Sequence, residues 1–182
     1  AAVLENGDVV SWGTLEDDKV ITEPDGLSNV VQVWGNEGAF AALKSDGSVL
    51  AWGDPGQGGG GANGNERLPA GLKNVISIAT TQYAFCALMA DGSILGWGDQ
   101  DHGGSYLPKG VSGVRRIFTT QYSFCVLTLE EKIFAWGSES SGGTIPGGTM
   151  KGVKTVGSSW GAFCALKDPG GSVSCWGHPS YG

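Results

Sequence analysis

Residues 84–98 read AFCALMADGSILGWG, and this stretch decides the fold. Two short apolar runs flank the dipeptide Asp91-Gly92, whose glycine can supply the positive φ that a tight hairpin turn requires. Closely similar stretches recur at residues 39–53, 123–137 and 162–177, and residues 1–13 match residues 41–53. The sequence therefore predicts a series of β-hairpins at regular spacing.

Each stretch ends in Trp-Gly, and the successive tryptophans are separated by 40, 45, 39 and 40 residues. They are Trp12, Trp52, Trp97, Trp136 and Trp176. A period of roughly 20–50 residues indicates units that cannot bury their apolar faces alone and that stack on neighbouring copies. We expect a repeat protein with these tryptophans in its core.

A hairpin with a three-residue turn places apolar residues opposite one another. The expected pairs are Leu43 with Val49, Leu88 with Ile94, and Leu127 with Ile133. A β-branched run precedes each hairpin and indicates a third strand, and the Gly-rich connectors after Trp-Gly leave room for a fourth. These runs begin at Val30, Val75, Val114 and Val153. Three or four antiparallel strands in about 40 residues are typical of one blade of a β-propeller.

The sequence thus predicts an all-β fold, a β-propeller of about four and a half blades in a single repeat domain over residues 1–182. The expected units are a partial blade over 1–25 and blades over 26–70, 71–109, 110–147 and 148–182. Residues 1–13 and 164–177 carry the same half of the repeat, so joining the two ends would duplicate some strands and omit others. We therefore expect an incomplete ring. Either further blades were cleaved or lie on another chain, or the units form an open arc that a neighbour covers, and every alternative implies protein contacts.

Charge and composition narrow the range of partners. The chain has 11 Lys and Arg against 18 Asp and Glu, a formal net charge of −7, and its scattered basic residues argue against nucleic-acid binding. No apolar stretch approaches the ~20 residues that span a bilayer, so we expect no direct membrane insertion. The expected partner is a protein or a neighbouring subunit.

The cysteines follow the repeat. Cys86, Cys125 and Cys164 share one repeat position with Ala41, which favours a small buried side chain. The hairpin pairing places Cys175 opposite Cys164, so this pair can form a disulfide, although the turn between them is one residue longer than in the other units. The sequence has no Cys-x-x-Cys pattern, which argues against zinc.

Two motifs of enzymes occur without their usual context. Residues 157–161 read Gly-x-Ser-x-Gly, but the pattern predicts no helix after them, as a nucleophile elbow would need. Residues 56–61 read Gly-x-Gly-x-x-Gly, but they follow a Trp-Gly and open no helix. Only two histidines exist, His102 and His178, at different repeat offsets. We expect no enzyme activity, no catalytic residue, no cofactor and no metal.

The loop before the first hairpin strand is the candidate partner-binding site. Equivalent loops of successive blades line one face, and aromatic side chains there would anchor a partner. The candidates are Gln82, Tyr83, Gln121, Tyr122 and Trp160, with Trp34 just upstream in the first full unit. The alternative is that Tyr83 and Tyr122 pack between blades.

The pattern AL-x-x-DGSV-x-x-WG-x-x-x-x-GG resembles the regulator of chromosome condensation repeat, and residues 56–59 are the closest copy of its glycine turn. The resemblance covers essentially the whole chain and is nearest to a short-repeat, bacterial-like subtype. It implies a β-propeller of this type that binds proteins. Family members of this kind form seven-bladed propellers, and their activities include nucleotide exchange on a small GTPase and inhibition of β-lactamase.

Four hypotheses for the function follow. The leading one is a non-enzymatic protein-interaction module, part of a propeller scaffold in a larger protein or complex. The second is a structural subunit of a large assembly. By resemblance, the others are an inhibitor of a secreted enzyme such as a β-lactamase, and a guanine nucleotide exchange factor for a small GTPase.

Overall fold

The computed structural model describes residues 1–12, 23–60 and 68–181. These residues form one two-stranded sheet and four three-stranded antiparallel sheets, whose strands follow one another in chain order. The sheets are β1 (Ala2–Val3) with β2 (Val9–Val10); β3 (Val30–Gly35), β4 (Ala39–Lys44) and β5 (Val49–Gly53); β6 (Val75–Thr80), β7 (Ala84–Met89) and β8 (Ile94–Gly98); β9 (Val114–Thr119), β10 (Ser123–Thr128) and β11 (Ile133–Gly137); and β12 (Val153–Ser158), β13 (Ala162–Lys167) and β14 (Val173–Gly177). Short helical turns follow three of the sheets, namely η2 (Pro55–Gln57), η3 (Gln100–Gly104) and η4 (Glu139–Ser141).

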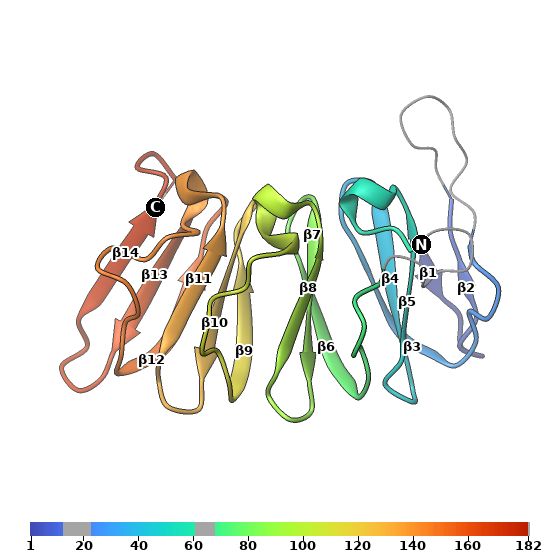
Figure 1. Ribbon diagram of the computed structural model, residues 1–182, viewed down its shortest axis with the longest axis horizontal. Coiled ribbons are helices and arrows are strands. Elements are labelled where there is room, and N and C mark those ends of the chain that lie inside the picture. Colours follow the sequence, from blue (N-terminus) through green and yellow to red (C-terminus); the bar gives the residue numbers. More distant parts are fainter. Residues whose placement is uncertain (13–22, 61–67, 182) are drawn as a thin grey trace.

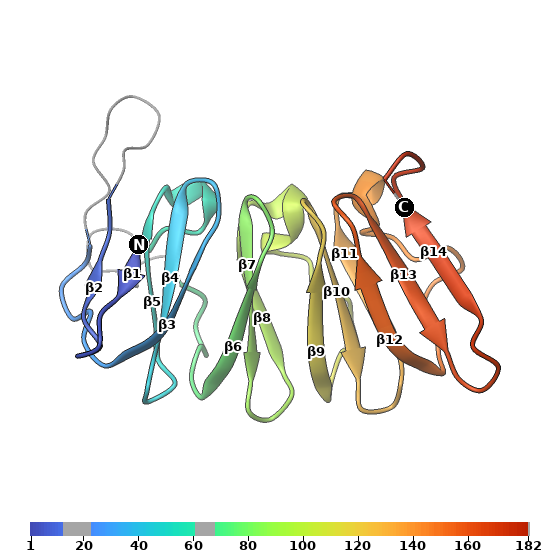
Figure 2. The same cartoon turned by 180° about the vertical axis from the view of Figure 1, so that it is seen from behind.

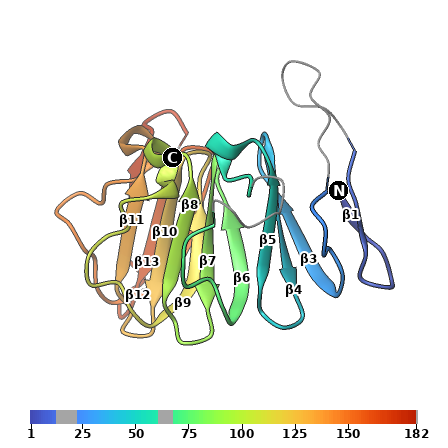
Figure 3. The ribbon, with the colours of Figure 1, turned by 45° about the vertical axis from the view of Figure 1, so that its right-hand side comes forward.

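The sheets stand side by side in chain order, with the two termini at opposite ends of the row (Figure 1). The reverse view and the turned view show the same arrangement (Figures 2 and 3). The row does not close on itself, so the predicted incomplete propeller of about four and a half blades is confirmed. Within the described part, the place of a fourth strand holds one isolated bridge, between Ile133 and Met150.

The predicted cross-strand pairs are confirmed. The register places Leu43 opposite Val49, Leu88 opposite Ile94, and Leu127 opposite Ile133. The first strand of each three-stranded sheet pairs with the middle strand through an irregularity near its beginning, where the ladder shifts by one residue. The same sequence pattern thus produces the same sheet four times.

Successive sheets are linked by main-chain hydrogen bonds at the hairpin ends. The amide of Val75, which begins β6, donates to the carbonyl of Gly47 in the preceding hairpin turn, at 3.0 Å. Val114 donates in the same way to Gly92 at 2.9 Å. A Cβ on Gly47 or on Gly92 would lie 2.9 Å from a Cα atom of the next unit, so glycine permits the close approach of these two turns. In the third hairpin Glu131, with a φ of 58°, takes the same position and accepts from the amide of Val153 at 2.9 Å.

The core lies between the sheets and is built from a repeated Phe, Trp and Gly. Trp136 lies against Phe124 of its own sheet, with ring centroids 5.3 Å apart, and its indole N–H donates to the carbonyl of Gly103 in the preceding connector at 3.0 Å. The indoles of Trp97 and Trp176 make the equivalent bonds, to connector carbonyls 3.2 and 2.9 Å away. Each of these three tryptophans therefore joins its own sheet to the one before, whereas the buried indole N–H of Trp52 has no partner among the described residues.

The prediction that all five repeated tryptophans lie in the core is wrong for Trp12. The four others are at most 7% exposed, whereas Trp12 is 66% exposed. Each buried tryptophan lies against a phenylalanine of its own middle strand. In the register of β1 with β2, the position opposite Trp12 lies before Ala1, outside the described residues, so the described sheet places no ring against Trp12.

The cysteine position is buried inside the row. Cys86 and Cys125 are fully buried free thiols, and burial raises the pKa of both. Cys164 and Cys175 face each other across β13 and β14 and form a disulfide, with Cα atoms 4.0 Å apart.

Candidate protein-binding face

The loops between first and second strands and the connectors after Trp-Gly gather at one end of the sheets. This follows from the antiparallel order, because the first and third strands of each sheet run in the same direction and end together. Figure 1 shows the helical turns along this upper end and the hairpin turns along the lower end. We call this end the loop face. It comprises residues 36–38, 54–58, 81–83, 99–104, 120–122, 138–142, 159–161 and 178–181.

Main-chain hydrogen bonds link the loops of all four three-stranded sheets. The amide of Glu37 donates to the carbonyl of Gln82 at 3.1 Å, Gln82 donates to Gln121 at 2.8 Å, and Gln121 donates to Trp160 at 2.8 Å. Side chains repeat part of this pattern, because the amide of Gln121 donates to that of Gln82, which donates to the carboxylate of Glu37. The loops therefore form one continuous strip across the sheets.

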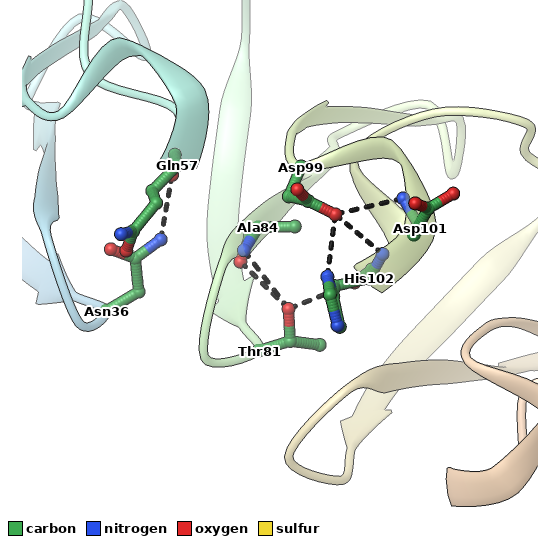
Figure 4. A network of polar contacts seen from close by, with 7 residues as sticks. All are labelled: Asn36, Gln57, Thr81, Ala84, Asp99, Asp101 and His102. Carbon is green, nitrogen blue, oxygen red and sulfur yellow. Dashed lines mark hydrogen bonds and ion pairs between the residues drawn. The ribbon is translucent and has the colours of Figure 1, made fainter.

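A polar residue at the start of each loop ties it to the connector of its own sheet. The hydroxyl of Thr81 donates to the carbonyl of His102 at 3.1 Å and accepts from the amide of Ala84 at 3.1 Å (Figure 4). In the preceding sheet, the side chain of Asn36 donates to the carbonyl of Gln57 at 2.8 Å (Figure 4). The equivalent bonds of the last two sheets come from Thr120 and Ser159. The loop face is thus held by its own polar contacts.

Aromatic and imidazole rings run along the loop face. Tyr83 and Tyr122 are stacked with centroids 5.8 Å apart, and the ring of His102 lies 4.8 and 4.9 Å from them. Trp160 follows Tyr122 at 6.3 Å, and Tyr181 follows Trp160 at 4.6 Å. We call this set, with His178 beside Tyr181, the aromatic strip. It spans three neighbouring sheets, and Trp160 and Tyr181 are 52% and 50% exposed.

Carboxylates surround the strip. Oδ1 of Asp99 lies 2.6 Å from Nδ1 of His102 and accepts from the amides of Asp101 and His102 (Figure 4). Burial, the nearby carboxylate of Glu37 and the charge of Asp99 raise the pKa of the Tyr83 hydroxyl. Such an environment favours uncharged hydroxyls and positively charged ligands.

Five of the six residues predicted from the sequence lie together on the loop face: Gln82, Tyr83, Gln121, Tyr122 and Trp160. Trp34 does not join them. It lies within β3 opposite Ala41 and packs, half-buried, against a core cluster, because it precedes the loop and its strand position faces the neighbouring sheet.

The structure is compatible with both alternatives for Tyr83 and Tyr122, namely an exposed binding surface and packing between blades. The two tyrosines contact each other across neighbouring sheets, and each stays partly exposed. The sequence reasoning missed His102, His178 and Tyr181 as members of this surface. Their signal was topological, because every connector after Trp-Gly begins on the same face as the loops between first and second strands.

The serine of the Gly-x-Ser-x-Gly motif is Ser159, and its hydroxyl forms hydrogen bonds within the loop face. Its hydroxyl accepts from the amide of Ala162 at 3.1 Å and donates to the carbonyl of Tyr181. The strand β13 follows directly, so the motif lacks the helix of a nucleophile elbow. Among the described residues, no three potential metal-binding side chains come together, and no helix is long and apolar enough to cross a bilayer.

Comparison with known proteins supports the repeat architecture. Residues 75–103 match the model of the regulator of chromosome condensation (RCC1) repeat. A comparison with curated protein sequences gives no match. Solved structures similar in fold include human WBSCR16, at 24% identity and a TM-score of 0.60 over 94% of this chain and 54% of that one.

Two further structures share this fold. The ectodomain of the Physcomitrella patens receptor kinase CR4 is 19% identical, with a TM-score of 0.58 over 81% of this chain and 41% of that one. Prp20p of Saccharomyces cerevisiae is also 19% identical, with a TM-score of 0.57 over 94% and 54%. The chain thus spans about half the length of these proteins.

The matched segment covers one unit, from the first strand of a sheet to its connector. The other three-stranded sheets repeat the strand order, the hairpin register and the irregularity of that unit. The described residues therefore repeat one unit and fold as an incomplete β-propeller, and the unit at residues 75–103 matches the regulator of chromosome condensation repeat.

Proposed function

We propose that the chain is a non-enzymatic protein-interaction module that binds a protein partner through the loop face. The observation that carries this proposal is the aromatic strip, in which partly exposed rings follow one another across three sheets. Aromatic side chains offer a large contact area with few rotatable bonds and are enriched at the centres of interfaces.

The rigidity of the loop face supports the same proposal. The loops are linked to one another by main-chain bonds and to their connectors by polar side chains, so the rings are held before a partner arrives. A surface ordered in advance loses little conformational entropy on binding, which favours affinity.

The neighbours in fold are also consistent with protein binding. Prp20p is described with binding properties toward Gsp1p and histones, and a second crystal structure shows yeast RCC1 (Prp20) with Kap60 bound. Nucleotide exchange on a small GTPase and inhibition of a secreted enzyme such as a β-lactamase are specific forms of this function. Each has a direct assay, nucleotide release in the first case and nitrocefin hydrolysis in the second.

One observation favours the second function, a structural subunit of a larger assembly. Val173 on the last sheet is 61% exposed, whereas Val49 and Ile133 at the equivalent position are 6% and 0% exposed. The outer side of this sheet could therefore receive another blade. In that case binding would depend on the sheet and not on the loop face.

The two functions are separated by substitutions on the loop face. A photo-crosslinking amino acid at Trp160 identifies the partner in an extract, with the same group at the exposed Tyr106, outside the strip, as the control. The affinity of the purified partner is then measured for a variant with Tyr83→Ala, Tyr122→Ala and Trp160→Ala. We expect at least a tenfold loss, since truncation of a central aromatic anchor costs about 2 kcal/mol or more.

A matched Tyr106→Ala variant should keep the affinity. If the triple variant binds its partner as tightly as the unsubstituted chain, the loop face is not the binding site. If the triple variant also keeps the native mass of the complex, measured by light scattering, the result supports a structural subunit and not binding through the loop face.

A further inference from the structure

The loop face carries negative charge and no positive side chain. Among its described segments, five residues are acidic and none is Lys or Arg. The acidic residues are Glu37, Asp54, Asp99, Asp101 and Glu139. Basic side chains lie toward the opposite, hairpin end of the sheets, as Lys44, Lys132 and Lys167 do at the ends of middle strands or in the turns after them. Carboxylates also lie at the hairpin end, as Asp46, Asp91 and Glu130 do, but lysines accompany them there. The rings that would bind a partner therefore lie at the end where the carboxylates of the described segments have no Lys or Arg beside them.

Two carboxylates belong directly to the aromatic strip. Glu37 accepts from Gln82, the residue before Tyr83. The amide of Asp99 donates to the carbonyl of Tyr83 at 3.0 Å, and its side chain lies against His102. On the next sheet, Ser138 makes the same main-chain bond to Tyr122 at 3.0 Å, which places the exposed Glu139 one residue away from that contact. Each tyrosine of the strip thus has acidic side chains in the neighbouring connector.

The spacing of the rings matches an extended chain. Successive rings from neighbouring loops are 5.8 Å apart between Tyr83 and Tyr122 and 6.3 Å apart between Tyr122 and Trp160. In a β-strand, side chains on one face recur at every second residue, about 6.5 Å apart. An extended segment laid along the strip would place alternate side chains near successive rings.

We propose that the aromatic strip binds an extended segment of a protein partner that carries Lys or Arg at alternate positions. The cationic groups lie against the parts of the Tyr83, Tyr122 and Trp160 rings that stay exposed, and the carboxylates of Glu37, Asp99 and Glu139 balance their charge. Cations are attracted to the faces of tyrosine and tryptophan rings within about 6 Å, and opposite charges on the two surfaces exclude acidic partners. This inference rests on the proposed function and gives its partner a chemical class.

Synthetic peptides test the proposal by fluorescence anisotropy on the full chain. One labelled peptide has three lysines at alternate positions with serine between them; a second has the same lysines in one contiguous run; a third has glutamates at the alternate positions. A neutral oligosaccharide is added as a competitor, because stacked rings with amides also suit sugars. We expect the alternating lysine peptide to bind about tenfold more tightly than either of the others, since each ring in register with a cation contributes two- to fivefold, by an order-of-magnitude estimate.

Charge variants separate recognition from folding. Glu37→Gln removes a charge but keeps an oxygen that can accept from Gln82, so the loop stays intact. We expect this variant to bind the alternating lysine peptide several-fold more weakly, while the matched variant Glu130→Gln, at the hairpin end, binds normally. Raising the salt concentration should also weaken binding of the alternating lysine peptide, because salt screens the attraction between lysines and carboxylates.

Three outcomes would overturn the proposal: equal binding of lysine and glutamate peptides, no effect of Glu37→Gln, or displacement of the lysine peptide by the oligosaccharide. Its failure is distinguishable from failure of the proposed function. If the triple alanine variant loses its natural partner but no lysine peptide binds, only the chemical class is wrong. If lysine peptides bind but the natural partner binds the triple alanine variant with unchanged affinity, the strip recognises basic segments but is not the partner site.

Discussion

Replacing Gly103 by alanine should destabilise the protein because this glycine forms part of the joint between two sheets. It has a φ of 96°, and an added Cβ would lie 2.6 Å from Cδ2 of Phe124. Phe124 is fully buried and lies against Trp136, so it has no room to move away. Both the backbone conformation and the close contact oppose any side chain here.

Gly110 separates the two effects. It has a φ of 79°, but a Cβ there would meet nothing within 4 Å. The left-handed backbone costs an alanine about 1–2 kcal/mol in either variant. Overpacking adds about 1–3 kcal/mol in the first variant only. We therefore expect Gly110→Ala to lose about 1–2 kcal/mol of unfolding free energy, and Gly103→Ala to lose about 2–5 kcal/mol, as the sum of the two effects.

Urea denaturation followed by tryptophan fluorescence measures both losses. A second variant, Phe124→Leu, makes space at the joint, so Gly103→Ala should cost less in that background than alone. Equal losses for Gly103→Ala and Gly110→Ala would refute the reasoning, because they would show that the phenylalanine contact does not constrain the glycine. An undiminished cost in the Phe124→Leu background would refute it as well.

Three further predictions concern the core and the cysteines. Trp136→Phe keeps an aromatic ring, smaller than the indole, but removes the hydrogen bond to the preceding connector, so it should lower the unfolding free energy by about 1–3 kcal/mol, measured by the same denaturation, and an unchanged midpoint would contradict this role. Because burial raises the pKa of the Cys86 and Cys125 thiols, little thiolate forms at neutral pH, and iodoacetamide should label them only after urea unfolds the chain; rapid labelling of the native protein would count against their burial. Replacing Cys164 and Cys175 together by serine should lower stability by about 2–3 kcal/mol, since the bridge closes a short loop, whereas equal melting temperatures with and without the bridge would show that it contributes nothing.

The sheets were predictable because every rule they follow is local. Alternating apolar residues around an Asp-Gly turn define a hairpin and its register, and the pairs Leu43 with Val49 and Leu88 with Ile94 follow from the turn length alone. Asn29 and Asn74 precede the first strands of their sheets with φ of 58° and 53°, at positions where two other units have glycine. A shared tolerance for the left-handed conformation explains why asparagine replaces glycine there.

The candidate site was predictable only in part. Tyr83 and Tyr122 occupy the same position in the aligned repeats, so the alignment predicts that they lie together. His102 and Tyr181 stand at unrelated offsets and meet the strip only through the paths of two different connectors. Trp34 was expected on the loop face because it lies near the loop in sequence, but nearness in sequence does not decide which way a strand residue faces.

The main-chain bonds that join the loops leave the side chains at those positions free to vary. Four successive sheets have Glu37, Gln82, Gln121 and Trp160 in the same place, and the same amide-to-carbonyl bond passes through all of them. An acid, two amides and an indole thus share one backbone geometry. Randomising these four codons should yield a library of correctly folded proteins with different binding preferences, in which selectivity changes one residue at a time while the framework stays constant.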